Sequence, residues 1–128
     1  MKKLLFTLAI TFLSIGFGKA QDKFRNDYNL VSFYDYETKT WSDWEHAEHT
    51  LVFNYNSNMD IAHFMPNGKA LTYRNIGNKE EGYTNGNHYQ ILNVIDDKGY
   101  DLQIQLFDDP SIGMKIILGQ SMVQFSKD

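Results

Sequence analysis

The strongest constraint on the fold is a strict two-residue alternation of apolar and polar side chains near the C-terminal end of the chain. The apolar members are Leu102, Ile104 and Leu106, and the polar members are Asp101, Gln103 and Gln105. Side chains of a β-strand point alternately to its two faces, whereas a helix would scatter these three apolar groups around its surface. We therefore predict a β-strand with one buried face. A shift of one residue in its pairing would expose all three apolar groups.

Similar runs recur along the chain, with turn signals between them. The strongest signal is Asn-Gly, at Asn67-Gly68 and Asn85-Gly86. Both residue types accept the positive φ that a tight type I′ hairpin requires. The strands expected from this pattern cover residues 30–36, 49–55, 60–65, 70–76, 88–95, 100–107, 114–118 and 122–125.

Eight short strands on about 100 residues predict an all-β domain, built as an antiparallel meander. A flat sheet of this size would leave an apolar face in water, so we expect a small barrel or a sandwich. We favour the barrel, because the loops are too short for a Greek-key crossover. The longest expected loop, residues 77–87, carries Lys79, Glu80 and Glu81 and is predicted to be a solvated connection. A single helical turn is predicted between Ser42 and His49, which opens with a capping-box spacing.

The first 20 residues have the three-part pattern of a signal peptide. Lys2 and Lys3 are followed by an apolar run over residues 4–17 and by small residues around Lys19. The run is shorter than the roughly 20 residues that cross a bilayer. We expect cleavage after Ala20, export to the periplasm or the medium, and no membrane span in the mature chain. Residues 21–128 then form a single domain.

The charge narrows the class of partner. The chain has a net charge of −4, and the loss of Lys2, Lys3 and Lys19 would leave 9 basic residues against 16 acidic ones, a net charge of −7. Nucleic acid is not expected as a partner, because such binding needs a concentrated basic face. The chain has no cysteine, so its stability must come from packing.

No catalytic, cofactor or metal motif is complete. His46 and His49 are three residues apart, so on a helical turn they could face one zinc or copper ion, whereas on a strand they would point to opposite faces. The spacing of a metallohydrolase helix is absent, and they are expected to be surface histidines at a strand entrance. An alternation of oxygen ligands from Asn54 to Asp60 lacks the glycine and glutamate that a calcium loop needs. No serine-nucleophile elbow occurs. Adjacent acids are expected in solvated loops, at Glu80-Glu81, Asp96-Asp97 and Asp108-Asp109.

Four aromatic residues early in the domain are the candidate binding residues: Tyr34, Tyr36, Trp41 and Trp44. Large rings in a small β domain usually belong to the core, and we expect these to close one end of the barrel. The alternative is that they line a cavity or an exposed recognition surface, where Trp and Tyr provide large contact areas at low entropy cost.

Three short motifs carry a resemblance: Trp-Ser-x-Trp at Trp41, Ser42 and Trp44, Asp-x-x-Gly from Asp96 to Gly99, and Val-x-Phe at Val123 and Phe125. Together with the signal peptide, they resemble a group of small exported bacterial all-β proteins without assigned function. The architecture is similar to reduced lipocalin-like, or calycin-like, barrels. Lipocalins carry Gly-x-Trp on their first strand, and the motif does not occur here, so no ligand residue can be transferred.

These observations favour an exported, non-catalytic binding module without a cofactor. Its ligand would be a small apolar molecule or a protein, bound at the barrel mouth or on an aromatic-rich face of the sheet. The alternative hypothesis is a secreted inhibitor or immunity-type protein. Such a protein would block a basic enzyme through acidic loops, which hold Glu80, Glu81, Asp108 and Asp109.

Overall fold

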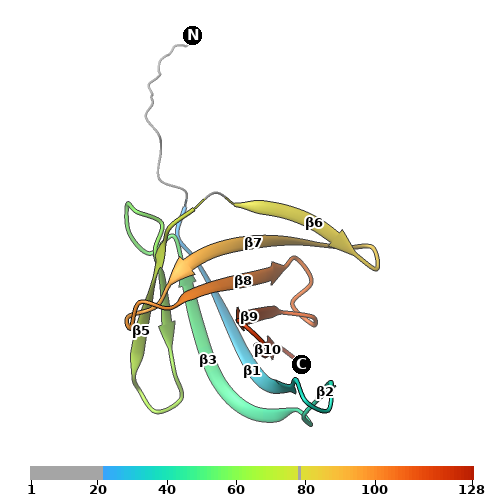
Figure 1. Cartoon of the computed structure of the whole chain (residues 1–128). Helices are drawn as coiled ribbons and strands as arrows, with labels where there is room; N and C mark the ends of the chain where they lie inside the picture. The colour runs from blue at the N-terminus through green and yellow to red at the C-terminus, as the bar shows by residue number, and fades with distance from the viewer. Residues whose placement is uncertain (1–21, 78) are drawn as a thin grey trace.

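The computed structural model describes residues 22–77 and 79–128, so the expected signal peptide of residues 1–20 lies outside the described part of the chain. The described residues form one antiparallel sheet of ten strands (Figure 1). No helix in this part of the chain has the length and apolar character needed to cross a membrane. The strands are β1 (Phe24–Asp35), β2 (Thr40–Trp41), β3 (Glu45–Phe53), β4 (Ile61–Phe64), β5 (Ala70–Asn75), β6 (Glu80–Thr84), β7 (Asn87–Ile95), β8 (Asp101–Phe107), β9 (Met114–Leu118) and β10 (Ser121–Ser126).

The strand order follows the chain, with two interruptions. It runs β10-β9-β8-β7-β5-β4-β3-β1-β2, and β6 pairs with β7 beside this path. β1 also pairs with β10, so the hydrogen-bonded order returns to the strand from which it starts. β2 and β3 both pair with β1, and β5 and β6 both pair with β7. The all-β antiparallel fold that the alternation predicts is therefore confirmed.

All eight predicted strands are present, seven of them with shifted ends and β9 with the predicted ends, and β2 and β6 are additional. The prediction that residues 77–87 form only a connection is wrong, because Glu80–Thr84 pairs with β7 from Asn87 to Ile91. The predicted exposure to solvent is confirmed, since Lys79, Glu80 and Glu81 are all exposed. The turn between these strands is the predicted type, with positive φ at both Asn85 (50°) and Gly86 (80°). Backbone pairing across this turn therefore makes a strand from a segment whose side chains show no apolar alternation.

The helical turn predicted between Ser42 and His49 is also wrong. β3 begins at Glu45, which pairs with Val31 of β1. Helices of one or two turns are marginal on their own. The twelve-residue edge of β1 offers this segment a ladder of backbone hydrogen bonds instead.

β1 starts six residues before the predicted strand and contains an irregularity. Its register with β3 shifts between Tyr28 and Leu30. A bulge adds one residue to one strand of a pair and so changes which positions face the core. Tyr28 and Val31 are three residues apart, and both belong to the core. A search for strict alternation cannot find such a strand.

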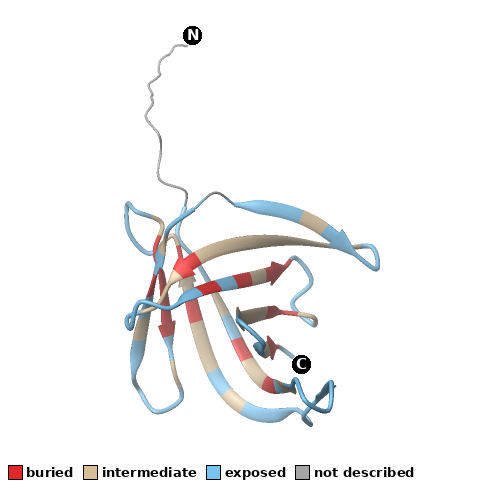
Figure 2. Ribbon diagram, in the orientation of Figure 1, coloured by how far each residue is buried: buried red, intermediate tan, exposed pale blue. Residues whose placement is uncertain are grey.

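One face of the sheet carries the hydrophobic core (Figure 2). The predicted buried face of β8 is confirmed, because Leu102, Ile104 and Leu106 are all buried. On the other face Asp101 and Gln103 are exposed, as predicted, and Gln105 is half-buried. β8 lies between β7 and β9 in the sheet. The other members of the buried cluster are Tyr28, Val31, Leu51, Phe53, Ile61, Tyr73, Val94, Met114 and Phe125.

Candidate functional site

A cavity of about 180 Å³ opens beside β7, and we call it the β7 cavity. Its apolar walls come from β1, β3, β7, β8 and the turn after β3. Its polar side chains come from the residue after β3, the end of β5, the residue before β6 and the middle of β7. The lining residues are Phe24, Phe53, Asn54, Met59, Asn75, Gly77, Lys79, Gln90, Leu92 and Leu106.

The register of the sheet explains why these side chains converge. Gln90 of β7 lies opposite Leu106 of β8 on one side and Glu81 of β6 on the other. Directly paired residues in an antiparallel sheet project to the same face, so all three share one face with Leu92, two residues along β7. Across the cavity, the paired rings of Phe24 and Phe53 stack with centroids 4.8 Å apart.

Two of the polar side chains at the cavity already form hydrogen bonds with neighbouring backbone groups. Asn54 Nδ2 donates a hydrogen bond to the carbonyl of Asp22, and Asn75 Oδ1 accepts one from the amide of Gly77. Within residues 22–77 and 79–128, by contrast, neither the Lys79 ammonium nor the Gln90 side-chain amide has an ion pair or hydrogen-bond partner. These two groups can therefore contact a bound molecule.

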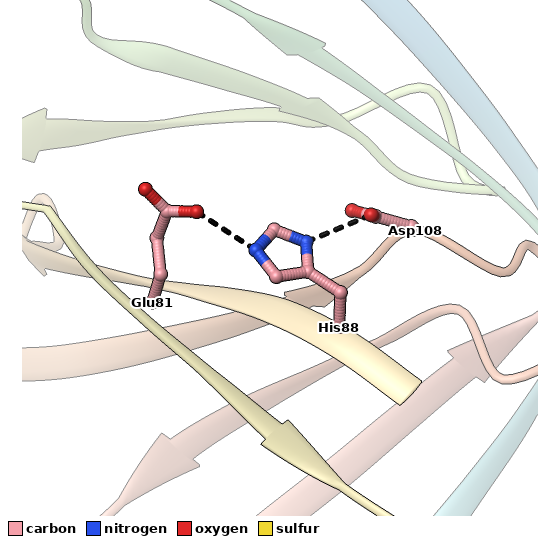
Figure 3. A network of polar contacts seen from close by, with 3 residues as sticks. All are labelled: Glu81, His88 and Asp108. Carbon is pink, nitrogen blue, oxygen red and sulfur yellow. Dashed lines mark hydrogen bonds and ion pairs between the residues drawn. The ribbon is translucent and has the colours of Figure 1, made fainter. Parts of the chain in front are cut away.

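A carboxylate–imidazole–carboxylate network flanks the cavity on the same face of the sheet (Figure 3). His88 Nε2 lies 2.7 Å from Glu81 Oε1, and His88 Nδ1 lies 2.7 Å from Asp108 Oδ2. Both nitrogens can donate at once only in the imidazolium form. The hydrogen bonds to Glu81, and then to Asp108, raise the pKa of His88 above its usual 6.5. The network ties β6, β7 and the loop after β8 together.

A second polar chain lies inside the core. His49 Nδ1 is 2.9 Å from His63 Nε2, and His63 Nδ1 is 2.7 Å from the Tyr73 hydroxyl. Burial, and then the charge of His49, lower the pKa of His63 to about 4. Burial also raises the pKa of Tyr73. All three groups are therefore neutral at pH 7. His63 and Tyr73 are buried in the core, which assigns these three residues to the stability of the fold.

The four predicted binding residues are only partly brought together. Tyr34, Tyr36 and Trp41 line an open hollow, with ring centroids 6.5 Å apart for the two tyrosines and 5.1 Å apart for Tyr34 and Trp41. Trp44 does not line this hollow. The expectation that the tryptophans belong to the core is wrong, since Trp41 is 37% and Trp44 46% exposed. A binding role for this set stays a prediction.

The other predicted polar sites have local explanations. His46 is exposed, whereas His49 is half-buried in its contact with His63. Asn56 Oδ1 accepts the amides of Asn58 and Asp60, which is turn chemistry. Within the described ranges, no three His, Asp or Glu residues are grouped so that they could hold a metal ion.

The acidic residues expected in loops are also more constrained than predicted. Glu80 and Glu81 belong to β6, whereas Asp108 and Asp109 follow β8 in a loop, as expected. Glu81 and Asp108 share His88, and the Asp109 carboxylate accepts hydrogen bonds from the amide and hydroxyl of Ser111. Three of the four carboxylates are therefore held by hydrogen bonds, although all four residues remain exposed to solvent.

Sequence analysis missed the β7 cavity because its lining comes from six separate segments. The signal that could have located part of it is the alternation in residues 88–95, where Gln90, Leu92 and Val94 share a face. Lys79 directly precedes β6 and Glu81 lies within it, opposite Gln90, but this relationship is visible only once β6 is recognised. Compared with known proteins, the chain matches no family model, no curated protein and no solved structure.

Proposed function

We propose that this protein is an exported, non-catalytic binding protein whose closed strand order forms a small barrel, with the β7 cavity as its ligand site. The observation that supports this proposal is a hollow of about 180 Å³ whose walls include two stacked phenylalanines and two leucines. Pockets for small molecules are typically apolar, with a few polar groups that fix orientation. Lys79 and Gln90 have that role here.

The volume sets the size of the ligand. An apolar protein cavity of about 150 Å³ holds a benzene-sized molecule. The β7 cavity therefore fits one ring or a short aliphatic chain, and any larger part of the ligand would extend into solvent. Small ligands gain between about 0.3 and 1.5 kcal/mol per non-hydrogen atom. A ligand of about ten atoms, at roughly 0.5 kcal/mol each, would bind with a dissociation constant of about 0.2 mM.

The test is a screen of single-ring and short-chain compounds against the mature chain, read from backbone amide chemical shifts. We expect saturable shifts at Phe53, Leu92 and Leu106. Leu92→Phe should reduce the shifts by filling the cavity, whereas Leu118→Phe at the exposed end of β9 should not. Thermal unfolding of both variants checks that they fold. If no compound gives saturable shifts at the cavity residues while the protein and its variants are folded, the proposal is overturned.

Export is part of the same proposal and has its own test. The supporting observation is the charged, apolar and small-residue pattern of residues 1–20. N-terminal sequencing of the protein recovered from the periplasm and from the medium should begin at Gln21. Recovery only from the cytoplasm, with Met1 retained, would contradict export.

A further inference from the structure

We propose that the ligand of the β7 cavity ends in one carboxylate, which pairs with Lys79, and that His88 keeps this position open by holding Glu81 away from it. The inference rests on the proposed binding function. It adds the chemical class of the ligand, a small apolar carboxylic acid, and it assigns His88 as a positioning residue.

The polar groups of the cavity favour an anion. Lys79 can only donate hydrogen bonds, and it carries a positive charge at neutral pH. The Gln90 amide, which also lines the cavity, adds two further N–H donors. None of the ten lining residues is acidic, although the chain as a whole has a net charge of −4. A carboxylate placed at this rim would meet a cation without displacing an existing ion pair of the described residues.

Glu81 is the residue that should neutralise Lys79. Lys79 directly precedes β6 and Glu81 is the second residue of that strand. Glu81 lies opposite Gln90, which lines the cavity together with Lys79. Glu81 Oε1 is instead 2.7 Å from His88 Nε2 (Figure 3).

Asp108 completes the arrangement. It holds the other nitrogen of His88 at 2.7 Å, which keeps both N–H groups engaged and the ring fixed between the two acids. The Tyr83 ring also contacts His88, with centroids 5.1 Å apart. The groups that face His88 from the neighbouring elements are thus Glu81, Asp108 and Tyr83. The network leaves the Lys79 ammonium without a carboxylate partner.

The first experiment compares two probes of the same size and shape, phenylacetate and phenylacetamide, at pH 7. We expect phenylacetate to bind the mature protein at least about fivefold more tightly. Lys79→Gln should remove this preference, because it should weaken the binding of phenylacetate and leave that of phenylacetamide unchanged. Lys69→Gln, which removes an exposed lysine from the turn between β4 and β5, is the matched control and should retain it.

The second experiment tests the role of His88. His88→Ala should release Glu81 to pair with Lys79 and weaken phenylacetate severalfold, with phenylacetamide unchanged. The double variant His88→Ala/Glu81→Gln should restore the preference, because the competing carboxylate is gone. If His88 had only a structural role, His88→Ala would weaken the binding of both probes, and Glu81→Gln would not restore it.

The outcomes separate the two proposals. Equal affinities for the two probes, or a preference that survives Lys79→Gln, would overturn the carboxylate inference and leave the binding function standing. If neither probe nor any screened compound shifts the cavity residues of the folded protein, both proposals fail. A preference lost in Lys79→Gln and His88→Ala, and regained in the double variant, supports the inference.

Discussion

His49 and His63 lie on adjacent strands, with Nδ1 of the first 2.9 Å from Nε2 of the second, and Tyr73 closes the chain at 2.7 Å from the other nitrogen of His63. The Phe125 ring contacts both imidazoles, with centroids 4.7 and 5.6 Å away. In the neutral arrangement, the Tyr73 hydroxyl donates to His63 Nδ1 and the His63 Nε2–H donates to His49 Nδ1. Every proton between these rings then has an acceptor. The neutral form of His63 is thus built into the core.

Acid should destabilise the protein through His63. Burial lowers its pKa to about 4 in the folded state, against 6.5 as the ordinary value. The unfolded chain therefore binds a proton at His63 more tightly than the folded protein does. The stability that neutral His63 contributes is complete above about pH 6.5 and is lost as the pH falls toward 4. The loss is on the order of 3 kcal/mol, and it should appear in denaturant unfolding measured between pH 7 and 4.

The control for this prediction compares two histidine variants. His63→Leu should be less stable at pH 7, because it leaves the Tyr73 hydroxyl without its partner, but its stability should fall less steeply with acid. His46→Leu, at an exposed position, should keep the slope of the parent protein. Parallel slopes for the parent protein and His63→Leu would show that His63 is not the group responsible.

Truncation of side chains on β8 should destabilise the protein much more on the buried face than on the exposed face. Ile104 is fully buried, whereas Gln103 is exposed. Ile104→Ala should lower the free energy of unfolding by about 2–5 kcal/mol, the range for removing a large aliphatic side chain from a core. Gln103→Ala should change it by no more than about 0.5 kcal/mol. Urea unfolding of both variants measures the difference, and similar losses would contradict the assigned faces.

Gly113 should not tolerate a side chain. Its φ is 78°, and a Cβ there would lie 1.8 Å from the carbonyl oxygen of Phe125. Gly119 has a φ of 57° and open space around its Cβ position, so Gly119→Ala carries only the backbone cost of about 1–2 kcal/mol. Gly113→Ala should cost more than that, because β10 must also move. Thermal unfolding of the two alanine variants tests the order, and the prediction fails if Gly119→Ala is the less stable.

His88 should titrate above its usual pKa of 6.5, because two carboxylates stabilise the imidazolium. Glu81→Gln should lower the pKa of His88 more than Asp108→Asn, since the hydrogen bond to Glu81 is the larger cause. Because the pKa is raised in the folded state, the stability that the imidazolium of His88 contributes is present below pH 6.5. It is lost as the pH rises through the raised pKa. NMR titration of the imidazole protons decides this, and a pKa unaffected by either substitution would contradict the network.

Local chemistry was sufficient for the strands and turns with strong patterns. The faces of β8 follow from the alternation of Leu102, Ile104 and Leu106 with polar residues, because strand side chains must alternate. Both Asn-Gly pairs mark hairpins, although only Asn85-Gly86 has positive φ at both residues. At Asn67-Gly68 only the glycine has positive φ, since Pro66 fixes a negative φ one residue earlier and favours a type I turn.

Long-range pairing decided the remainder of the fold and the whole of the candidate site. β6 and the start of β1 are strands because β7 and β3 offer them hydrogen bonds, and the pairing of β1 with β10 joins residues about ninety positions apart. The same pairings bring His88 between Glu81 and Asp108 and set Lys79 beside Leu92. Periodicity reports the face on which a side chain lies, but its neighbours depend on register between distant strands, and only the tertiary structure determines that register.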